Sequence, residues 1–290
     1  MPVRNGAQWI QSAIESVLRQ DYANFEILLV DDGSTDDSIL IAQDLAGSKL
    51  RVVTAQGQGL ARALAIGVRA ADTEMVFRLD QDDKASSQRL SKQVSFLNNN
   101  PDYVLVGSNV KIIGDRGTFL GRSRFPLTDQ GIRLRMNIGN PFAHSAVAFR
   151  RRAVLDAGNY WSPDAKPFPE DYHLWCRLAS RGLMANLSER LVDYHANESG
   201  LALANKEIMR SHTSDISWGW FSSQGFLTAK NPNLQEAWHA CFGSNLSISR
   251  QEALAVTRAL IQARTSIPQK FNDHGLRFTH FMIPVTRMWR

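Results

Sequence analysis

The fold of this chain is decided first by residues 25–36, FEILLVDDGSTD. The apolar run predicts a buried strand, and the aspartates, glycine and serine that end it predict a turn into a helix. The same order recurs on both sides of this stretch. Further strands are predicted at 50–53 and 75–79, and amphipathic helices at 9–18, 39–45 and 60–71. Because strands and helices alternate, we expect an α/β fold with a mostly parallel sheet flanked by helices.

The second half of the chain has a mixed pattern that becomes helical. Between residues 90 and 149 a helix is predicted at 92–97, and strands at 104–106 and 146–149. A helix that starts at an acidic pair is predicted over 170–181. Beyond about residue 199, helices are predicted at 201–221, 234–242 and 250–264. We therefore expect a larger α/β domain over 1–198 and a helical C-terminal region over 199–290.

Composition and charge limit the class of protein. Of the 290 residues, 43% are hydrophobic and 21% are charged, which is typical of a globular protein and excludes disordered and fibrous classes. The net charge of +5 suits an acidic partner such as a nucleotide diphosphate. Because the sequence has no concentrated basic stripe with stacking aromatic residues, nucleic acid is not the expected partner.

The expected location follows from what the sequence patterns lack. No apolar run approaches the roughly 18 residues of a membrane-spanning helix, and the first residues do not have the pattern of a secretory signal. Cys176 and Cys241 fit no metal-ligand spacing. These features predict a cytoplasmic protein. Residues 277–290 mix arginines with apolar side chains, which predicts either a packed tail or peripheral contact with the inner face of a membrane.

Two groups of carboxylates follow predicted strands. Asp80, Asp82 and Asp83 come directly after the strand at 75–79, and Asp31 and Asp32 end the strand at 25–30. Clustered carboxylate oxygens are the ligands that Mg²⁺ and Mn²⁺ prefer, although such a cluster can also be a solvated turn that favours the next helix. Ligands of open α/β sheets bind beyond the carboxyl ends of the strands, so we expect both groups at one sheet edge.

Five motifs, in order along about the first two hundred residues, resemble those of the bacterial polysaccharide type of family 2 glycosyltransferases, which have the GT-A fold. The motifs are Pro2-Val3-x-Asn5-Gly6, VDDGSTD at 30–36, Asp80-x-Asp82-Asp83, Asn140-Pro141-Phe142-x-His144 and EDYxLWxRL at 170–178.

The resemblance implies a donor site for a nucleotide-diphosphate sugar. Pro2, Val3 and Asp32 match the segments that contact the nucleoside, with Asp32 at the position that recognises uracil. Asp80 and Asp82 match the element that contacts the ribose and binds the metal on the diphosphate, Mn²⁺ or Mg²⁺. A UDP-sugar is therefore the expected donor.

The resemblance also implies the chemistry of transfer. Asp171 matches the general base, and its neighbour Glu170 is either an ordinary acid at a helix N-terminus or a residue that binds acceptor. His195 matches a late histidine near the metal. His144 is either structural or a contact for donor phosphates or acceptor. The expected reaction is an inverting transfer to a saccharide or lipid-linked glycan acceptor, in which Asp171 takes the acceptor proton.

Three arginines are further candidates for binding phosphate: Arg62, Arg78 and Arg177. Arg177 is equally a candidate to pair with Asp171 and orient it.

One departure from the family pattern leaves an alternative open. Relatives usually carry a hydrophobic strand immediately before the Met-Pro-Val segment, and this chain begins at that methionine. The sequence therefore predicts a sheet that lacks its first strand and leaves the neighbouring strands unpaired. Under this alternative the chain is a truncated, non-catalytic relative that binds nucleotide sugars or acts as a scaffold.

Overall fold

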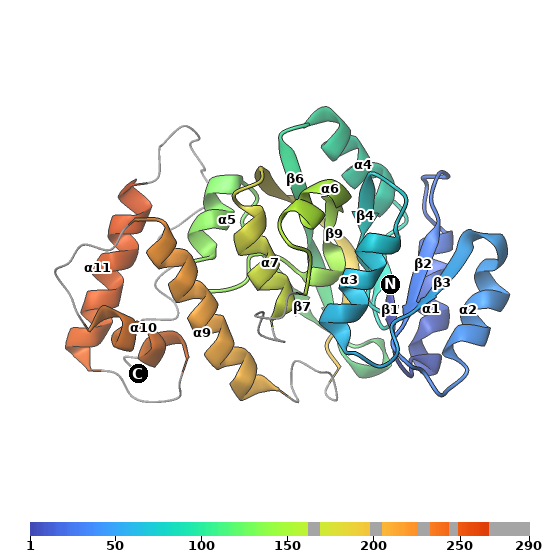
Figure 1. Ribbon diagram of the computed structural model, residues 1–290, viewed down its shortest axis with the longest axis horizontal. Helices are drawn as coiled ribbons and strands as arrows, with labels where there is room; N and C mark the ends of the chain where they lie inside the picture. The colour runs from blue at the N-terminus through green and yellow to red at the C-terminus, as the bar shows by residue number, and fades with distance from the viewer. Residues whose placement is uncertain (162–168, 198–204, 226–232, 244–248, 267–290) are drawn as a thin grey trace. The chain divides into compact units, whose positions relative to one another are not determined.

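The computed structural model describes residues 1–161, 169–197, 205–225, 233–243 and 249–266 (Figure 1). The chain forms two compact units, one of Met1–Phe125 with Phe142–Glu198 and one of Pro126–Pro141 with Ser199–Arg290. Residues 126–141, expected in the first domain, thus group with the second unit. Each unit has its own core and is described by itself.

The first unit begins with a three-stranded parallel sheet in the order β1-β2-β3. Helices α1 and α2 cover one face, where Leu29 is fully buried, and α3 packs on the other face against Leu28 and Val30. The two faces are both apolar because successive strand residues point to opposite sides. The elements are β1 Pro2–Val3, α1 Ala7–Leu18, β2 Ile27–Asp31, α2 Ser38–Ala46, β3 Leu50–Thr54 and α3 Leu60–Ala70.

The turn after β2 takes the form that residues 25–36 predict. Gly33 has a φ of 82°, a conformation that favours glycine, and the N–H of Ser34 donates to Asp31 Oδ1 at 2.8 Å. Asp36 then accepts hydrogen bonds from the N–H groups of Ala7 and Ser38, at the starts of α1 and α2. One acidic side chain therefore satisfies N-terminal donors of two helices.

A second, six-stranded sheet has the order β4-β8-β6-β9-β5, with β7 paired to β6. The β6–β9 pair is parallel, and the other pairs are antiparallel. The parallel order expected from the sequence thus holds in the first sheet, while the second sheet is mixed. Its strands are β4 Met75–Phe77, β5 Lys84–Ala85, β6 Tyr103–Ile113, β7 Phe119–Arg122, β8 Ala148–Arg150 and β9 Leu183–His195.

The long strands β6 and β9 are poorly visible in the sequence. Only 104–106 was predicted as strand in the region of β6, and no strand was predicted over β9. Their register shifts at Ser108 and Asn109, so polar residues interrupt the alternation that identifies a strand. Of the remaining helices of this unit, the two near residues 92–97 and 170–181 were expected, and the one at residues 151–156 was not. They are α4 Arg89–Asn99, α6 Arg151–Asp156 and α7 Glu170–Leu178.

The two sheets do not join among the described residues. Strand β1 lies at one edge of the first sheet, and β4 lies at one edge of the second. Since β1 has only two residues, most of the adjacent edge of β2 has no partner strand in the described part of the chain. The sequence predicted that the neighbouring strands at this edge of the sheet would lack a pairing strand.

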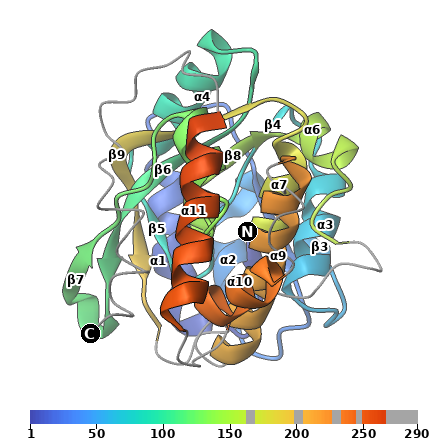
Figure 2. The ribbon, with the colours of Figure 1, turned by 90° about the vertical axis from the view of Figure 1, so that its left-hand side faces the viewer.

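The second unit is helical, and α10 lies between α9 and α11 in the views of Figures 1 and 2. Its helices are α5 Asp129–Arg135, α9 Lys206–Ser223, α10 Leu234–Phe242 and α11 Arg250–Ser266. Residues 201–204 of the first expected helix lie outside the described residues, as does the tail at 277–290. Within the described ranges, no helix combines the length and apolarity needed to cross a bilayer.

Trp238 is the centre of the helical core. It is fully buried, its ring centroid lies 4.7 Å from that of Phe221, and its Nε1–H donates to Ser217 Oγ at 2.9 Å. Burial and a satisfied indole N–H together make this side chain a strong packing contact.

We expect Trp238→Ala to destabilise the protein by about 3–5 kcal/mol, because it leaves a large cavity and removes the hydrogen bond to Ser217. Urea unfolding followed by circular dichroism measures the change. Trp238→Phe is the matched control, since it keeps most of the volume and should cost clearly less. Equal stability of the alanine variant and the parent protein would contradict this view of the core.

Candidate active site

The end of β2 brings together three of the expected nucleoside contacts. Pro2 and Val3 pair with Val30 and Asp31, and the N–H of Asp32 donates to Val3 O at 2.8 Å. Pro2, Val3 and Asp32 are all buried. Strand pairing, which joins residues about thirty positions apart, therefore assembles this part of the site.

The Asp32 carboxylate also shapes the loop before α3. Its Oδ1 and Oδ2 accept the N–H groups of Gln58 at 2.8 Å and Gly59 at 2.9 Å, and Arg4 Nη1 lies 3.9 Å from Oδ2. Each carboxylate oxygen retains a further acceptor position, so these bonds leave room for a ligand donor. Contact with uracil stays a prediction.

The aspartates after β4 form a compact cluster. One carboxylate oxygen from each of Asp80, Asp82 and Asp83 lies within 4.8 Å of the others. Asp83 is only 1% exposed; its Oδ1 accepts the N–H of His195 at 2.7 Å, while its buried Oδ2 has no hydrogen-bond partner in the described part of the chain. Burial, followed by the charge of Asp80, raises the pKa of Asp83 to about 7.

This donor set fits a hard divalent cation. Three carboxylates, one of whose oxygens has no hydrogen-bond partner among the residues that the structure describes, supply the ligand type of Mg²⁺ and Mn²⁺ sites. Burial also raises the pKa of Asp82, because the charged form loses hydration and repels Asp80. A bound cation would offset both effects.

A buried arginine holds one member of the cluster. Arg78, expected as a phosphate partner, forms an ion pair through Nη1 with Asp80 Oδ2 and is only 5% exposed. Ser145 Oγ lies 2.8 Å from Arg78 Nη1 and accepts the N–H of Asp80 at 2.8 Å. The guanidinium is therefore engaged inside the protein, where it offsets part of the cluster's negative charge.

His195, expected as a metal ligand, lies beside the cluster. The backbone N–H of His195 donates to Asp83 Oδ1 at 2.7 Å, and the ring Nε2 of His195 is 3.1 Å from Asp115 Oδ1. The ring Nδ1 is buried and has no hydrogen-bond partner among the described residues. One ring nitrogen thus stays available, and metal ligation by His195 stays a prediction.

Glu170 and Asp171 form the first two residues of α7, and both are buried. The Oδ1 of Asp171 accepts the N–H of Tyr172 at 2.6 Å, and the helix N-terminus favours a negative charge there. Burial, followed by the charge of Asp171, raises the pKa of Glu170 to about 8. At neutral pH Glu170 therefore carries a proton.

His144 lies in an aromatic pocket against these acids. Its Nδ1 is 3.5 Å from Glu170 Oε1, its Nε2 is 3.0 Å from Tyr160 Oη, and Trp175 packs edge-on against the ring. Burial, followed by the charge of Arg78, lowers the pKa of His144 well below its ordinary value. A neutral His144 has one ring N–H and one acceptor nitrogen, and its Nε2 is hydrogen-bonded to the Tyr160 hydroxyl. The structural alternative for His144 is thereby well supported, and a donor or acceptor contact stays a prediction.

Arg78 also links the two groups of acids. The charges of Arg78 and Asp80 both act on the pKa of Glu170, so the acids after β4 and those at the start of α7 share one electrostatic environment. Two segments about ninety residues apart in sequence therefore lie close enough for their charges to influence each other.

The other two arginines have different surroundings. The Arg62 guanidinium stacks 4.2 Å above the Trp161 ring and donates to Gln58 Oε1. Arg177 does not orient Asp171; its Nη1 and Nη2 donate to the carbonyls of Ala157 and Asn159, both at 2.7 Å. Its role is to hold the loop that carries Tyr160.

Comparison with known proteins identifies the family. Residues 1–158 match the family described as "Glycosyl transferase family 2". The chain belongs to this family. It is 31% identical over 201 residues to the amylovoran biosynthesis glycosyltransferase AmsE of Erwinia amylovora, which covers 68% of this chain and 73% of AmsE.

Solved structures show that this family 2 glycosyltransferase has the GT-A fold. S. aureus TarS in complex with UDP-GlcNAc is similar with a TM-score of 0.62 at 19% identity, over 90% of this chain and 79% of TarS. The mannosyltransferase PcManGT of Pyrobaculum calidifontis, in complex with GDP-Man and Mn²⁺, has a TM-score of 0.54 at 19% identity, over 92% and 74%. The expected fold and family are thus confirmed.

Sequence reasoning missed two residues that support the site of this glycosyltransferase, Ser145 and Tyr160, and it named Arg78 only as a candidate for binding phosphate. Arg78 gave a signal, because a charged residue within an apolar strand run requires a buried partner. Ser145 and Tyr160 gave none, since each acts through a contact with a residue distant in sequence.

The pKa of Glu170 gives a prediction for stability. Between pH 4.5 and about 8 the folded protein keeps a proton on Glu170 that the unfolded chain releases, so stability falls as pH rises through this window. Glu170→Gln removes this loss and should be more stable than the parent by up to about 4 kcal/mol near pH 8.5, but nearly equally stable near pH 5. Chemical unfolding across pH tests this. Glu207→Gln, an exposed site on α9, is the control, and parallel curves for parent and Glu170→Gln would refute the assignment.

Proposed function

We propose that this family 2 glycosyltransferase transfers a sugar from a UDP-sugar to a saccharide or lipid-linked glycan, with inversion at the anomeric carbon. The observation that carries the proposal is the cluster of Asp80, Asp82 and Asp83, which has a buried oxygen without a described partner and shares its electrostatic environment with Glu170. Such a site offers a position for a cation and, beside Glu170, the proposed base Asp171. Displacement of a nucleoside diphosphate by an acceptor hydroxyl requires both.

The proposed donor site starts at the end of β2. Pro2, Val3 and Asp32 hold the nucleoside, and Arg62 lies at the start of α3 beside the loop that Asp32 orders. TarS binds a UDP-sugar and PcManGT a GDP-sugar, so relatives of this fold differ in nucleotide. The choice of UDP therefore rests on Asp32.

The metal of the proposed mechanism is Mn²⁺ or Mg²⁺. Asp82, with Asp80 and Asp83, would hold it, and His195 Nδ1 is a further ligand. When bound, such a cation neutralises charge on the leaving diphosphate as a Lewis acid. Arg78 and Ser145 fix the position of Asp80, and the His195 N–H fixes Asp83.

Asp171 is the proposed general base. It accepts the proton of the acceptor hydroxyl while the acceptor oxygen bonds to the anomeric carbon and the bond to the diphosphate breaks. Protonated Glu170 and neutral His144 keep other charge away from Asp171. Attack from the face opposite the leaving group inverts the anomeric configuration.

The proposal also covers the acceptor of the sugar and the place in the cell where the reaction occurs. AmsE takes part in amylovoran biosynthesis, which supports a saccharide or lipid-linked glycan as acceptor. We place the reaction in the cytoplasm, with peripheral contact to the inner face of the membrane for a lipid-linked acceptor. The net charge of +5 favours an anionic surface.

Donor binding gives a direct test. A UDP-sugar at 100 times its Kd, with Mn²⁺, should stabilise the protein by about 2.7 kcal/mol, because ligand binds the folded state only. Thermal unfolding with a panel of UDP- and GDP-sugars measures the shift, and NMR of the transfer product reports the anomeric configuration. EDTA should abolish both stabilisation and transfer, and Mn²⁺ should restore them. Stabilisation that EDTA leaves unchanged, or a retained configuration, would refute the proposal.

A further inference from the structure

Strands β6 and β7 lie side by side and form a hairpin with an exposed end (Figure 2). Its turn is Asp115–Gly117, and just beyond the turn Phe119 and Leu120 are 55% and 58% exposed. In the described part of the chain, β7 pairs with β6 alone. Exposed apolar side chains that occur singly are common, whereas adjacent ones on an edge strand leave a surface open to a partner. The pair therefore indicates a contact surface.

A β-bulge contributes to the exposure of this pair. Ile112 pairs with Gly121, and Ile113 pairs with Phe119. Leu120 consequently has no opposite residue on β6. A bulge bends its strand and turns side chains away from the regular alternation of a sheet. The two apolar side chains therefore need not follow the inward and outward alternation of a flat strand.

The base of the hairpin is held by hydrogen bonds. Asn109 Oδ1 accepts the N–H of Phe125 at 2.8 Å and the hydroxyl of Ser123 at 3.2 Å. The oxygen of the same hydroxyl accepts the N–H of Val110 at 2.8 Å. The exposed pair thus belongs to an ordered element.

Three basic side chains accompany the apolar pair. Arg116, Arg122 and Arg124 are all exposed, and the Arg122 guanidinium lies 5.5 Å from the centroid of the Phe119 ring. None of these arginines forms an ion pair with a residue that the structure describes. Their charges are therefore available to an anionic partner.

The acidic groups of this region have partners of their own. Residues 111–124 contain four basic side chains and one acidic side chain, that of Asp115. Asp115 Oδ1 lies 3.1 Å from His195 Nε2, and Asp193 of β9 forms an ion pair with Lys111 at 3.3 Å. The end of the hairpin thus keeps an excess of positive charge, and its turn contacts a residue of the candidate active site.

We propose that residues 115–124, the hairpin tip, dock on the surface of an anionic lipid bilayer. Phe119 and Leu120 enter the boundary between head groups and acyl chains, and the three arginines contact lipid phosphates. Arginine suits this position because its apolar stem lies along apolar groups while its guanidinium binds phosphate. Two apolar side chains are too few for the core of a stable protein–protein interface, which buries about 800 Å² on each partner.

Docking through the hairpin tip brings the bilayer close to the candidate active site. Asp115 begins the tip and contacts His195, which lies beside the cluster of Asp80, Asp82 and Asp83. A lipid-linked acceptor in the same bilayer would reach the site by diffusion within the membrane. This role of docking rests on the proposed function, whereas docking itself does not.

Vesicle binding by the full chain tests the proposal, without donor, acceptor or metal. We expect at least ~10-fold tighter binding to vesicles of phosphatidylglycerol and phosphatidylcholine in equal parts than to phosphatidylcholine alone. Combined Phe119→Ser and Leu120→Ser should weaken binding by about 10-fold, because apolar contact is lost. Combined Arg116→Gln, Arg122→Gln and Arg124→Gln should weaken it by about 100-fold, since each basic side chain near an anionic surface contributes about five-fold.

Matched controls change exposed residues elsewhere. Leu40→Ser alters a leucine of α2 that is 66% exposed, and combined Arg19→Gln, Arg69→Gln and Arg152→Gln removes three charges outside the hairpin. Both should bind within about two-fold of the parent, because salt screens exposed charges far from the contact. In the parent, anionic vesicles should slow hydrogen exchange in segment 114–124.

Four outcomes would overturn the proposal. They are equal binding to anionic and neutral vesicles, equal losses in the hairpin and control variants, unchanged exchange in segment 114–124, and self-association that the two serine substitutions abolish. The last would assign the surface to a second copy of the chain. The exchange measurement uses the parent protein, so it holds even where a variant fails to fold. Transfer without vesicle binding would refute docking alone, and vesicle binding without transfer would refute the proposed function alone.

Discussion

Asp82→Ala should lower sugar transfer by about 10³-fold or more while the metal-free protein stays at least as stable as the parent. The loss is expected because one ligand of the proposed cation site disappears, and charge on the leaving diphosphate is then poorly neutralised. Stability is expected to hold because Asp80, Asp82 and Asp83 repel one another and burial penalises their charged forms. The measurements are initial transfer rates and thermal unfolding with and without Mn²⁺.

The control for this experiment is Asp44→Ala, which changes an exposed aspartate on α2. It should leave both the rate and the effect of Mn²⁺ unchanged. In Asp82→Ala the increase in Tm on addition of Mn²⁺ and UDP-sugar should vanish. Full transfer by Asp82→Ala would exclude the proposed metal role, and a large fall in metal-free stability would mean that the cluster is a structural turn.

Asp171→Asn should lower transfer by about 10²–10⁴-fold without weakening donor binding. Asparagine keeps an oxygen for the N–H of Tyr172, so the start of α7 retains its geometry, but it cannot accept a proton from the acceptor. Donor binding should persist because its proposed contacts lie at Asp32 and at the cluster after β4. Transfer rates at saturating acceptor, together with thermal shifts by UDP-sugar and Mn²⁺, separate the two effects.

Asp102→Asn, an exposed site before β6, controls for the effect of an amide on the protein as a whole. Two results would contradict the base assignment. One is a normal rate in Asp171→Asn; the other is a slow rate that comes entirely from lost donor binding. If Glu170→Gln proved the slower variant, the base would be Glu170, although its raised pKa places a proton there.

The order of elements in the first unit could be predicted from sequence because it depends on local patterns. The apolar stripe on α1 predicts a helix, the apolar run before Asp31 predicts a strand, and the acidic residues after β4 predict a turn. Each of these patterns can be recognised within a few residues. Strands β6 and β9 could not be found this way, since their register shifts near Ser108 break the alternation. The grouping of 126–141 with the helical unit depends on contacts across the chain, which periodicity does not report.

The residue types of the site could be read from the sequence, but their burial, their partners and their pKa values could not. Three aspartates within four residues predict a cation site, whereas the burial of Asp83 and the partner of Asp80 depend on how β4, β8 and β9 pack. Likewise, the Glu-Asp pair predicts acid chemistry, while the raised pKa of Glu170 arises from burial in the folded protein.

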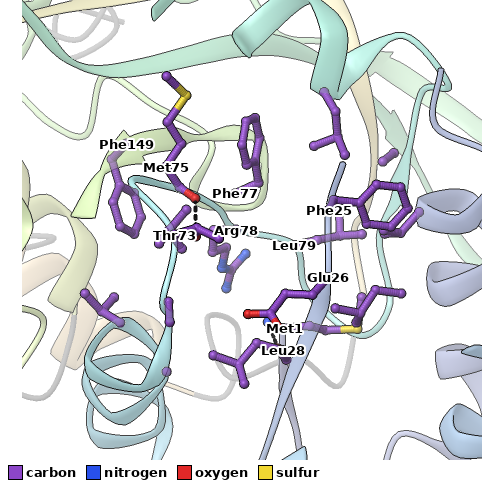
Figure 3. Close-up of a pocket in the computed structure, with 18 of the residues that line it drawn as sticks. Met1, Phe25, Glu26, Leu28, Thr73, Met75, Phe77, Arg78, Leu79 and Phe149 are labelled. Atoms are coloured by element: carbon purple, nitrogen blue, oxygen red, sulfur yellow. Dashed lines mark hydrogen bonds between the residues drawn. The ribbon is translucent and has the colours of Figure 1, made fainter. Parts of the chain in front are cut away.

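By itself, the sequence determined the alternating α/β order, the family motifs and the carboxylates that the chemistry needs, because these are encoded in the spacing of residue types along the chain. Only the tertiary structure decided that Arg78 holds Asp80, that His144 is neutral between Glu170 and Tyr160, and that residues of β2 and β4 line one cavity of about 490 Å³ (Figure 3). These features depend on distances between segments far apart in sequence and on the loss of water around them, and both exist only after folding.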